Sequence, residues 1–143
     1  MKIIELKCLS GLVLETVEMS AKELFKDVIS EEFSKFAPHH SDLIIADTDM
    51  YFKKYDISVA VSGSLVVGVM MSYYNTLEWL VVKDTYRRSG VGDMLLKHFE
   101  SKHKGTVELF AYANNPFISF YEKHGYSKRP YNREAVKFTK VLM

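Results

Sequence analysis

Residues 77–100 read LEWLVV KDTYRRSGVG DMLLKHFE, and this stretch decides the fold. Its first part, Leu77–Val82, is mostly apolar and predicts a largely buried central strand. From Val91 onward apolar residues recur at helical spacing, which predicts an amphipathic helix. The connecting loop carries two arginines and two glycines. A buried strand that leads through such a loop into a helix indicates a mixed α/β domain.

The loop that ends in Arg87-Arg88-Ser89-Gly90-Val91-Gly92 has the features of a phosphate-binding turn. The first amides of a helix have no acceptor within the helix, and its dipole adds positive charge there. Glycine at 90 and at 92 lets an anion approach the backbone, and two arginines add mobile positive charge at the rim. The loop lacks the Lys-Ser/Thr of a Walker A motif and the third glycine of a dinucleotide fingerprint. A solvated surface loop is the alternative interpretation.

The chain before this stretch predicts one long helix and an early strand. Ser20 and Glu23 form a capping box, apolar residues follow at helical spacing, and Ala37-Pro38 ends the pattern, so we expect a helix over Ser20–Phe36. Lys2–Leu6 and Leu12–Val17 are alternatives for the first strand.

The remaining segments complete a mixed sheet. A short helix is expected near Asp47–Lys54, and two β-rich runs around Ser62-Gly63-Ser64 predict an antiparallel hairpin. The other expected elements are the hairpin strands Ile57–Val61 and Leu65–Tyr74, a strand at Thr106–Ala111, a short helix at Phe117–Lys123 and a closing strand at Val136–Leu142. We therefore predict a single α/β (α+β) domain over residues 1–143, with a mostly antiparallel central sheet flanked by helices.

Composition narrows the function. A chain of 143 residues buries enough surface to fold without a disulfide or metal, and its one cysteine, Cys8, excludes an intrachain disulfide. The net charge of +1 argues against a general nucleic-acid binder, although an acidic excess before residue 57 is balanced by a basic excess after residue 120. No apolar run approaches the ~20 residues of a membrane span, and the start has no signal-peptide pattern. We expect a cytoplasmic protein with no membrane partner.

A second cluster follows the predicted helix: Asn114-Asn115-Pro116 and then Phe120-Tyr121-Glu122-Lys123-His124-Gly125-Tyr126. Together with the Arg-x-x-Gly-x-Gly loop, in this order and spacing, it resembles the GNAT superfamily of acetyl-CoA-dependent N-acetyltransferases. The resemblance covers residues 77–128. It implies that the strands at 77–82 and 106–111 are parallel and splay apart, and that acetyl-CoA is the acetyl donor, with no metal. Dimers are common among similar proteins, which makes a homodimer one alternative for the assembly.

The resemblance also implies roles for individual residues. The cofactor-binding positions would be Leu80, Val81 and Val82 on the strand, Arg87, Arg88, Ser89, Gly90, Val91 and Gly92 in the turn, and Asn114, Phe117 and Tyr121 beyond it. Tyr121 would be the general acid that protonates the departing thiolate; a core aromatic is the alternative. Phe117 stands where the family often has alanine, and Arg88 replaces a frequent glycine.

The general base is less clearly marked. Glu78 lies on the strand that often carries a carboxylate in this family, but in a different register from some members, and a chain of water molecules is the alternative. The function implied is transfer of acetyl from acetyl-CoA to a primary amine by direct attack in a ternary complex. A non-catalytic CoA-binding regulatory or interaction module is the alternative. The acceptor, a small amine or a protein amino group, is left open; the acidic N-terminal segment, with Asp42, Asp47 and Asp49, favours a cationic amine.

Overall fold

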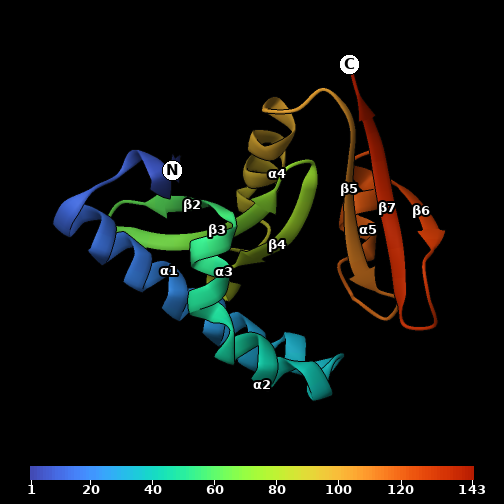
Figure 1. The fold of residues 1–143 in the computed structure, drawn as a ribbon, viewed down its shortest axis with the longest axis horizontal. Helices are drawn as coiled ribbons and strands as arrows, with labels where there is room; N and C mark the ends of the chain where they lie inside the picture. Colours follow the sequence, from blue (N-terminus) through green and yellow to red (C-terminus); the bar gives the residue numbers. More distant parts are fainter.

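A computed structural model describes all 143 residues of the chain. The chain forms a seven-stranded sheet. Helices lie on both faces of this sheet (Figure 1). The elements in chain order are β1 (Lys2–Glu5), α1 (Gly11–Glu31), α2 (Pro38–Ala46), α3 (Thr48–Lys54), β2 (Asp56–Ser62), β3 (Leu65–Tyr73), β4 (Thr76–Val82), α4 (Val91–Ser101), β5 (Gly105–Tyr112), α5 (Ile118–Lys123), β6 (Ser127–Pro130) and β7 (Ala135–Leu142). No helix is long and apolar enough to cross a membrane.

The sheet has the order β1-β2-β3-β4-β5-β7-β6, and every neighbouring pair is antiparallel except β4 and β5. One buried cluster lies between the sheet and α1, around Phe25 and Ile29. A second cluster lies against α4, around Leu95, Phe99 and Phe138. The predicted fold class, a mostly antiparallel mixed sheet with one parallel pair, is therefore confirmed.

The parallel strands β4 and β5 are paired only where they begin. Thr76 lies opposite Glu108 and Leu77 opposite Leu109, and no pairing follows, although β4 continues to Val82 and β5 to Tyr112. Asn75 reinforces the paired end, since its side-chain amide donates to the Thr106 carbonyl at 3.0 Å. Beyond Leu77 the two strands diverge (Figure 1), so the edge of β4 that faces β5 has no strand partner there.

A β-bulge lies in β4 at Glu78. Met71 of β3 pairs with Trp79 and Ser72 pairs with Leu77, so Glu78 has no partner across the ladder. Leu77 consequently faces the α4 side of the sheet, whereas Trp79 packs on the α1 side. The extra residue reverses the alternation of the strand at the point where β4 and β5 separate.

Helix α4 packs closely on β3 because β3 has a glycine at the contact. A Cβ atom at Gly68 would lie 2.8 Å from Val91 Cγ1 and 2.9 Å from Leu95 Cδ1. The absence of a side chain lets the first two turns of α4 approach the sheet, and this fixes where the helix begins relative to β4.

The N-terminal third departs most from the predictions. The first helix begins at Gly11 rather than after Ser20, so Ser20 lies in mid-helix and residues 12–17 are helical, while Lys2–Glu5 is the first strand. Leu12 and Val13 are exposed, which obscures the apolar stripe that continues upstream through Leu14 and Val17. The structure also adds α2 and β6, which the sequence pattern did not predict, since Pro38 begins a new helix as well as ending the previous pattern.

Candidate active site

The largest cleft of the molecule opens where β4 and β5 diverge. It has a volume of about 1240 Å³ and is lined by the unpaired part of β4, the end of β5, the loop before α4, and α5. Most of the predicted site residues line it: Glu78, Leu80, Val81, Val82, Arg87, Arg88, Gly90, Val91, Gly92, Phe117 and Tyr121. Ser89 and Asn114 do not.

The turn before α4 has the backbone geometry of an anion site. Gly90 precedes the helix with a φ of 83°, a conformation that favours glycine, and Val91 is buried behind it. Gly92 serves another purpose, because a Cβ there would lie 3.3 Å from Phe120 Cζ of α5. Arg88, at the position that often holds glycine in the family, has a φ of 63° and is exposed. Gly90, Val91, Gly92 and the unpaired Arg88 of the turn therefore line the cleft.

Arg87 is not the mobile cation that the sequence suggested. Its guanidinium is ion-paired with Glu32 beyond the end of α1, lies 3.8 Å from an Asp84 carboxylate oxygen, and sits 5.1 Å from the centre of the Phe117 ring. These contacts hold Arg87 across the cleft from one wall to the other. Phe117 thereby acts as a stacking surface for Arg87 as well as part of the wall.

Tyr121 lies on α5 with its ring packed against Phe120, Tyr126 and Phe138, at centroid distances of 5.2, 6.1 and 5.6 Å. Its hydroxyl makes no hydrogen bond within the protein, and the residue lines the cleft. Burial raises the pKa of the Tyr121 phenol above its ordinary value, so that it stays protonated at neutral pH. A fixed ring with a free hydroxyl in the cleft is suited to donate a proton.

Glu78, the bulge residue, also lines the cleft. Burial raises the pKa of its carboxyl group, and the charge of Lys54 on α3 only partly opposes this rise. The Glu78 carboxylate in turn contributes to the raised pKa values of Tyr51 and Tyr55, which places these α3-side rings near it. A carboxylate with a raised pKa and no ion-pair partner is a stronger base than an ordinary carboxylate.

Asn114 occupies a structural position. Its amide donates to the Phe36 carbonyl at 3.1 Å, which ties the loop after β5 to the segment between α1 and α2. The neighbouring Asn115 lines the cleft instead, and its side-chain oxygen accepts a hydrogen bond from the Phe117 amide at 2.8 Å. The predicted role of Asn114 in orienting a cofactor remains a prediction.

An aromatic wall, formed by Phe33, Phe36, Trp79 and Tyr112, closes the end of the cleft near α1 and α2. Phe33 is in edge contact with the other three rings, at centroid distances of 4.9 to 5.5 Å. The Tyr112 hydroxyl is hydrogen-bonded to His40 Nδ1 of α2. Trp79 of β4 belongs to this wall, whereas Tyr73 and Tyr74, at the end of the neighbouring strand β3, lie outside the cleft and are exposed.

Several of these features leave little signal in the amino-acid sequence. A bulge has no residue signature, and the partners of Glu32, Asn114 and His40 lie between 55 and 78 residues away along the chain. The adjacent residues His39 and His40 belong to no group of three or more metal-ligating side chains. Aromatic residues at helical spacing in 33–36 were the one usable hint of the wall.

The family model of the acetyltransferase (GNAT) domain matches residues 51–128, more than half of the chain. The chain belongs to the GNAT acetyltransferase family. The matched range runs from α3 to β6 and includes the bulge, the glycine turn and Tyr121. No curated protein sequence matches the chain.

Solved structures show the same GNAT fold over the full length. An aminoglycoside 6′-acetyltransferase type Ii aligns with a TM-score of 0.71 at 19% identity, covering 100% of this chain and 98% of the other. The apo form of YjaB from Escherichia coli has a TM-score of 0.76 at 14% identity, with 99% and 98% covered. The PaiA N-acetyltransferase from Thermoplasma acidophilum, solved in complex with coenzyme A, has a TM-score of 0.61 at 21% identity, with 99% of both chains covered.

Proposed function

We propose that this GNAT protein transfers an acetyl group from acetyl-CoA to a primary amine. The observation that carries the proposal is the continuity of the splayed β4 edge with the glycine turn of α4. The free β4 edge offers backbone groups to the amides of a pantetheine arm, in the manner of an added strand. The turn offers helix amides to a diphosphate, and Arg88 and Lys123 add positive charge to the cleft wall.

The chemistry needs one proton acceptor and one proton donor in the same cleft. An amine must lose its proton before it attacks a thioester, and Glu78, with its raised pKa, is suited to take that proton. The departing thiolate must gain a proton, and the free hydroxyl of Tyr121 supplies it. The burial that raises the Tyr121 pKa also raises the pKa of a thiol in the same place, so that donor and acceptor stay matched.

We further propose that the acceptor is a cationic amine with an apolar segment. Glu78 and Glu134 line the cleft with no ion-pair partner, and aromatic rings line the wall beside them. Aromatic faces and carboxylates together favour organic cations. The carboxylates differ from those that the sequence indicated, because Asp42, Asp47 and Asp49 do not line the cleft, and Asp49 is paired with Lys22 at 3.0 Å.

The test has two arms. Calorimetric titration should show that acetyl-CoA binds and that ATP, another polyphosphate, does not. In a panel of amines, CoA should be released only when an amine accepts the acetyl group. Diamines should react faster than acidic amino acids. Binding without acetyl transfer to any amine would support the non-catalytic module instead, and no binding of acetyl-CoA would contradict both functions.

A further inference from the structure

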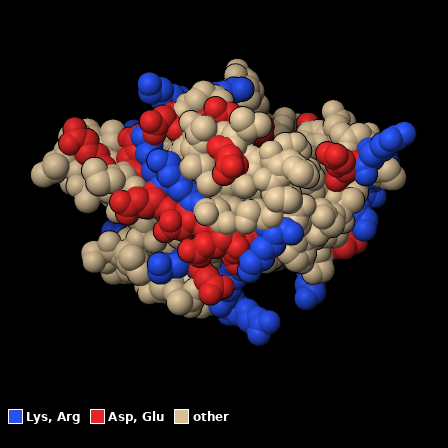
Figure 2. All heavy atoms as spheres, turned by 90° about the horizontal axis from the view of Figure 1, so that it is seen from below, with Lys and Arg blue, Asp and Glu red and all other residues tan.

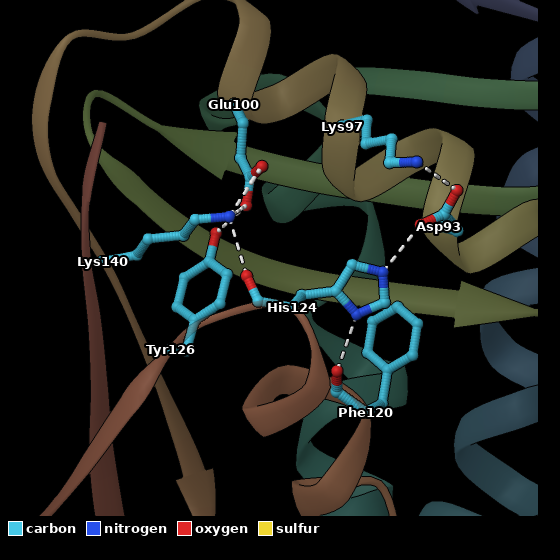
Figure 3. A network of polar contacts seen from close by, with 7 residues as sticks. All are labelled: Asp93, Lys97, Glu100, Phe120, His124, Tyr126 and Lys140. Carbon is cyan, nitrogen blue, oxygen red and sulfur yellow. Dashed lines mark hydrogen bonds and ion pairs between the residues drawn. The ribbon is translucent and has the colours of Figure 1, made fainter. Parts of the chain in front are cut away.

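A polar network behind the cleft joins α4, α5 and β7 (Figure 3). His124 lies at its centre, directly after the last residue of α5. Its Nδ1 is 2.7 Å from the Phe120 carbonyl oxygen, and its Nε2 is 2.7 Å from Asp93 Oδ1 in the first turn of α4. The ring therefore bridges the end of one helix and the start of the other.

Both contacts of the ring require a proton on the histidine. A carbonyl oxygen and an ionised carboxylate can each only accept a hydrogen bond. Asp93 is ionised at neutral pH, since the hydrogen bond from His124, and then Lys97 at 3.1 Å, hold the pKa of its carboxyl group below the ordinary value. Two acceptors therefore face the two ring nitrogens, and both contacts are hydrogen bonds only in a ring that carries both protons.

The other charged groups around the ring are paired among themselves. Lys140 of β7 donates to the His124 carbonyl at 2.7 Å and to Glu100 at 3.2 Å, and the Tyr126 hydroxyl donates to Glu100 at 2.8 Å (Figure 3). Next to His124 in the chain, Lys123 is exposed. The Asp93 carboxylate thus depends on His124 and on the exposed side chain of Lys97 for its compensation.

Asp93 lines the cleft one residue after Gly92, beside the turn proposed to hold a diphosphate. An uncompensated carboxylate there would repel that anion. The same bridge fixes α5, none of whose residues is fully buried, against Gly92 through the Phe120 contact. His124 therefore contacts both the carboxylate beside the proposed diphosphate turn and the helix α5 that carries Tyr121.

We propose that His124, as an imidazolium paired with Asp93, is a positioning residue that keeps the diphosphate turn free of uncompensated negative charge. This inference rests on the proposed function and adds a requirement at the turn. Affinity for acetyl-CoA should be high while His124 is paired with Asp93. Without that partner only the exposed Lys97 would offset the Asp93 carboxylate, and the affinity should fall.

The experiment measures the dissociation constant of acetyl-CoA for the wild type, H124Q, D93N and the double variant. H124Q should weaken binding about tenfold at neutral pH. Adding D93N to H124Q should restore the constant to within about threefold of the wild type, because the repelling charge is gone. His39→Gln, an exposed histidine outside the cleft, is the matched control.

Each outcome bears on a separate claim. Additive losses in the double variant would indicate a merely structural role and would overturn this inference, with the proposed function unaffected. Absence of acetyl-CoA binding by the wild type would overturn both.

Discussion

Two ionisable side chains face the cleft from opposite elements, Glu78 from β4 and Tyr121 from α5, and burial raises the pKa of each. The same physical cause favours opposite roles. A carboxyl group with a raised pKa becomes a stronger base, whereas a phenol with a raised pKa remains a proton donor over a wider pH range. Neither group has an ion-pair partner that would fix its charge.

Replacing Tyr121 with phenylalanine should lower the turnover number about a hundredfold, since general acid catalysis contributes on this scale. The dissociation constant of acetyl-CoA should stay nearly unchanged, because the ring and its packing against Phe138 are kept. Stopped-flow acetyl transfer and calorimetry measure the two quantities. Tyr131→Phe, an exposed tyrosine, is the control, and an unchanged turnover in the Tyr121 variant would remove Tyr121 from the mechanism.

Glu78 should give the pH–rate profile its acidic limb. The base must be ionised, so kcat/KM should fall as the pH drops through the Glu78 pKa, at a higher pH than for an ordinary carboxyl group. Glu78→Gln should lower the rate about a hundredfold and abolish that limb. It should also leave the protein at least as stable at neutral pH, because burial disfavours the charge. If the limb persists in the variant, water and not Glu78 takes the proton; Glu122→Gln, an exposed carboxylate, is the control.

At the scale of elements, the site depends on how closely α4 approaches the sheet. Gly68 on β3 allows that approach, and the start of α4 determines where the amides of Gly90 and Gly92 lie. The bulge in the neighbouring strand β4 turns the Glu78 carboxylate toward the cleft, at the point where the β4–β5 pairing ends. A small residue in β3 and a bulge in β4 thus place the two ends of the cleft.

Gly68→Ala should destabilise the fold by about 2 kcal/mol, because the new methyl group would overlap Val91 and Leu95. Urea unfolding measures the change. Val91→Ala removes the nearer obstacle, so the double variant should lose less stability than the sum of the two single variants. Strict additivity would show that α4 moves away as a whole, and acetyl-CoA affinity should then fall in parallel.

The sequence predicted the elements around the glycine turn well and the N-terminal helices poorly, for a physical reason. Within residues 77–100 a clear strand pattern is followed by a clear helix periodicity, because each element is buried on a defined side. In α1, exposed apolar residues such as Leu12 and Met19 weaken the stripe, and Ser20 offers a plausible cap in mid-helix. The short edge strand β6 has no buried residue, and so it leaves no hydrophobic pattern to find.

For the candidate site, the residue types were predictable and their pairings were not. The motif located the turn, Tyr121 and the β4 strand, which line one cleft. The pairing of Arg87 with Glu32, the tie from Asn114 to Phe36, and the His124–Asp93 bridge join segments distant in sequence. Such contacts depend on the folded arrangement and cannot be read from a single sequence.

At the scale of the whole molecule, acidic and basic side chains are not separated into different surfaces on the face that Figure 2 shows. Figure 2 shows a band of acidic atoms with basic atoms on both sides of it, on the face seen from below. Ion pairs link distant elements: Glu5 with Lys102, and Glu108 with Lys137 at 3.0 Å. The lysine contacts lower the Glu5 pKa, so its share of the stability is present at neutral pH and is lost in acid.

Alkaline unfolding should depend on Tyr126. Burial, and then its hydrogen bond to Glu100, raise the pKa of this phenol in the folded state. Its contribution to stability is therefore present below the unfolded pKa of about 10 and is lost as the pH rises above it. Tyr126→Phe should cost about 1 kcal/mol at pH 7 and should flatten the alkaline fall of the thermal midpoint. Calorimetry from pH 7 to about pH 11 measures this, with Tyr131→Phe as the control; an equal alkaline fall in both variants would contradict it.

The divergence of β4 and β5 has a consequence for how the protein can be observed. Amides on the free β4 edge have no strand carbonyl opposite them, so in the unliganded protein they should exchange with deuterium faster than amides of the β2–β3 ladder. Any molecule that fills the gap must cover those groups. Exchange measured on peptides spanning residues 78–82 then becomes a label-free gauge of occupancy, which would let libraries of amines and thioesters be screened without knowing the reaction. Unchanged exchange on saturation with acetyl-CoA would show that the ligand lies elsewhere.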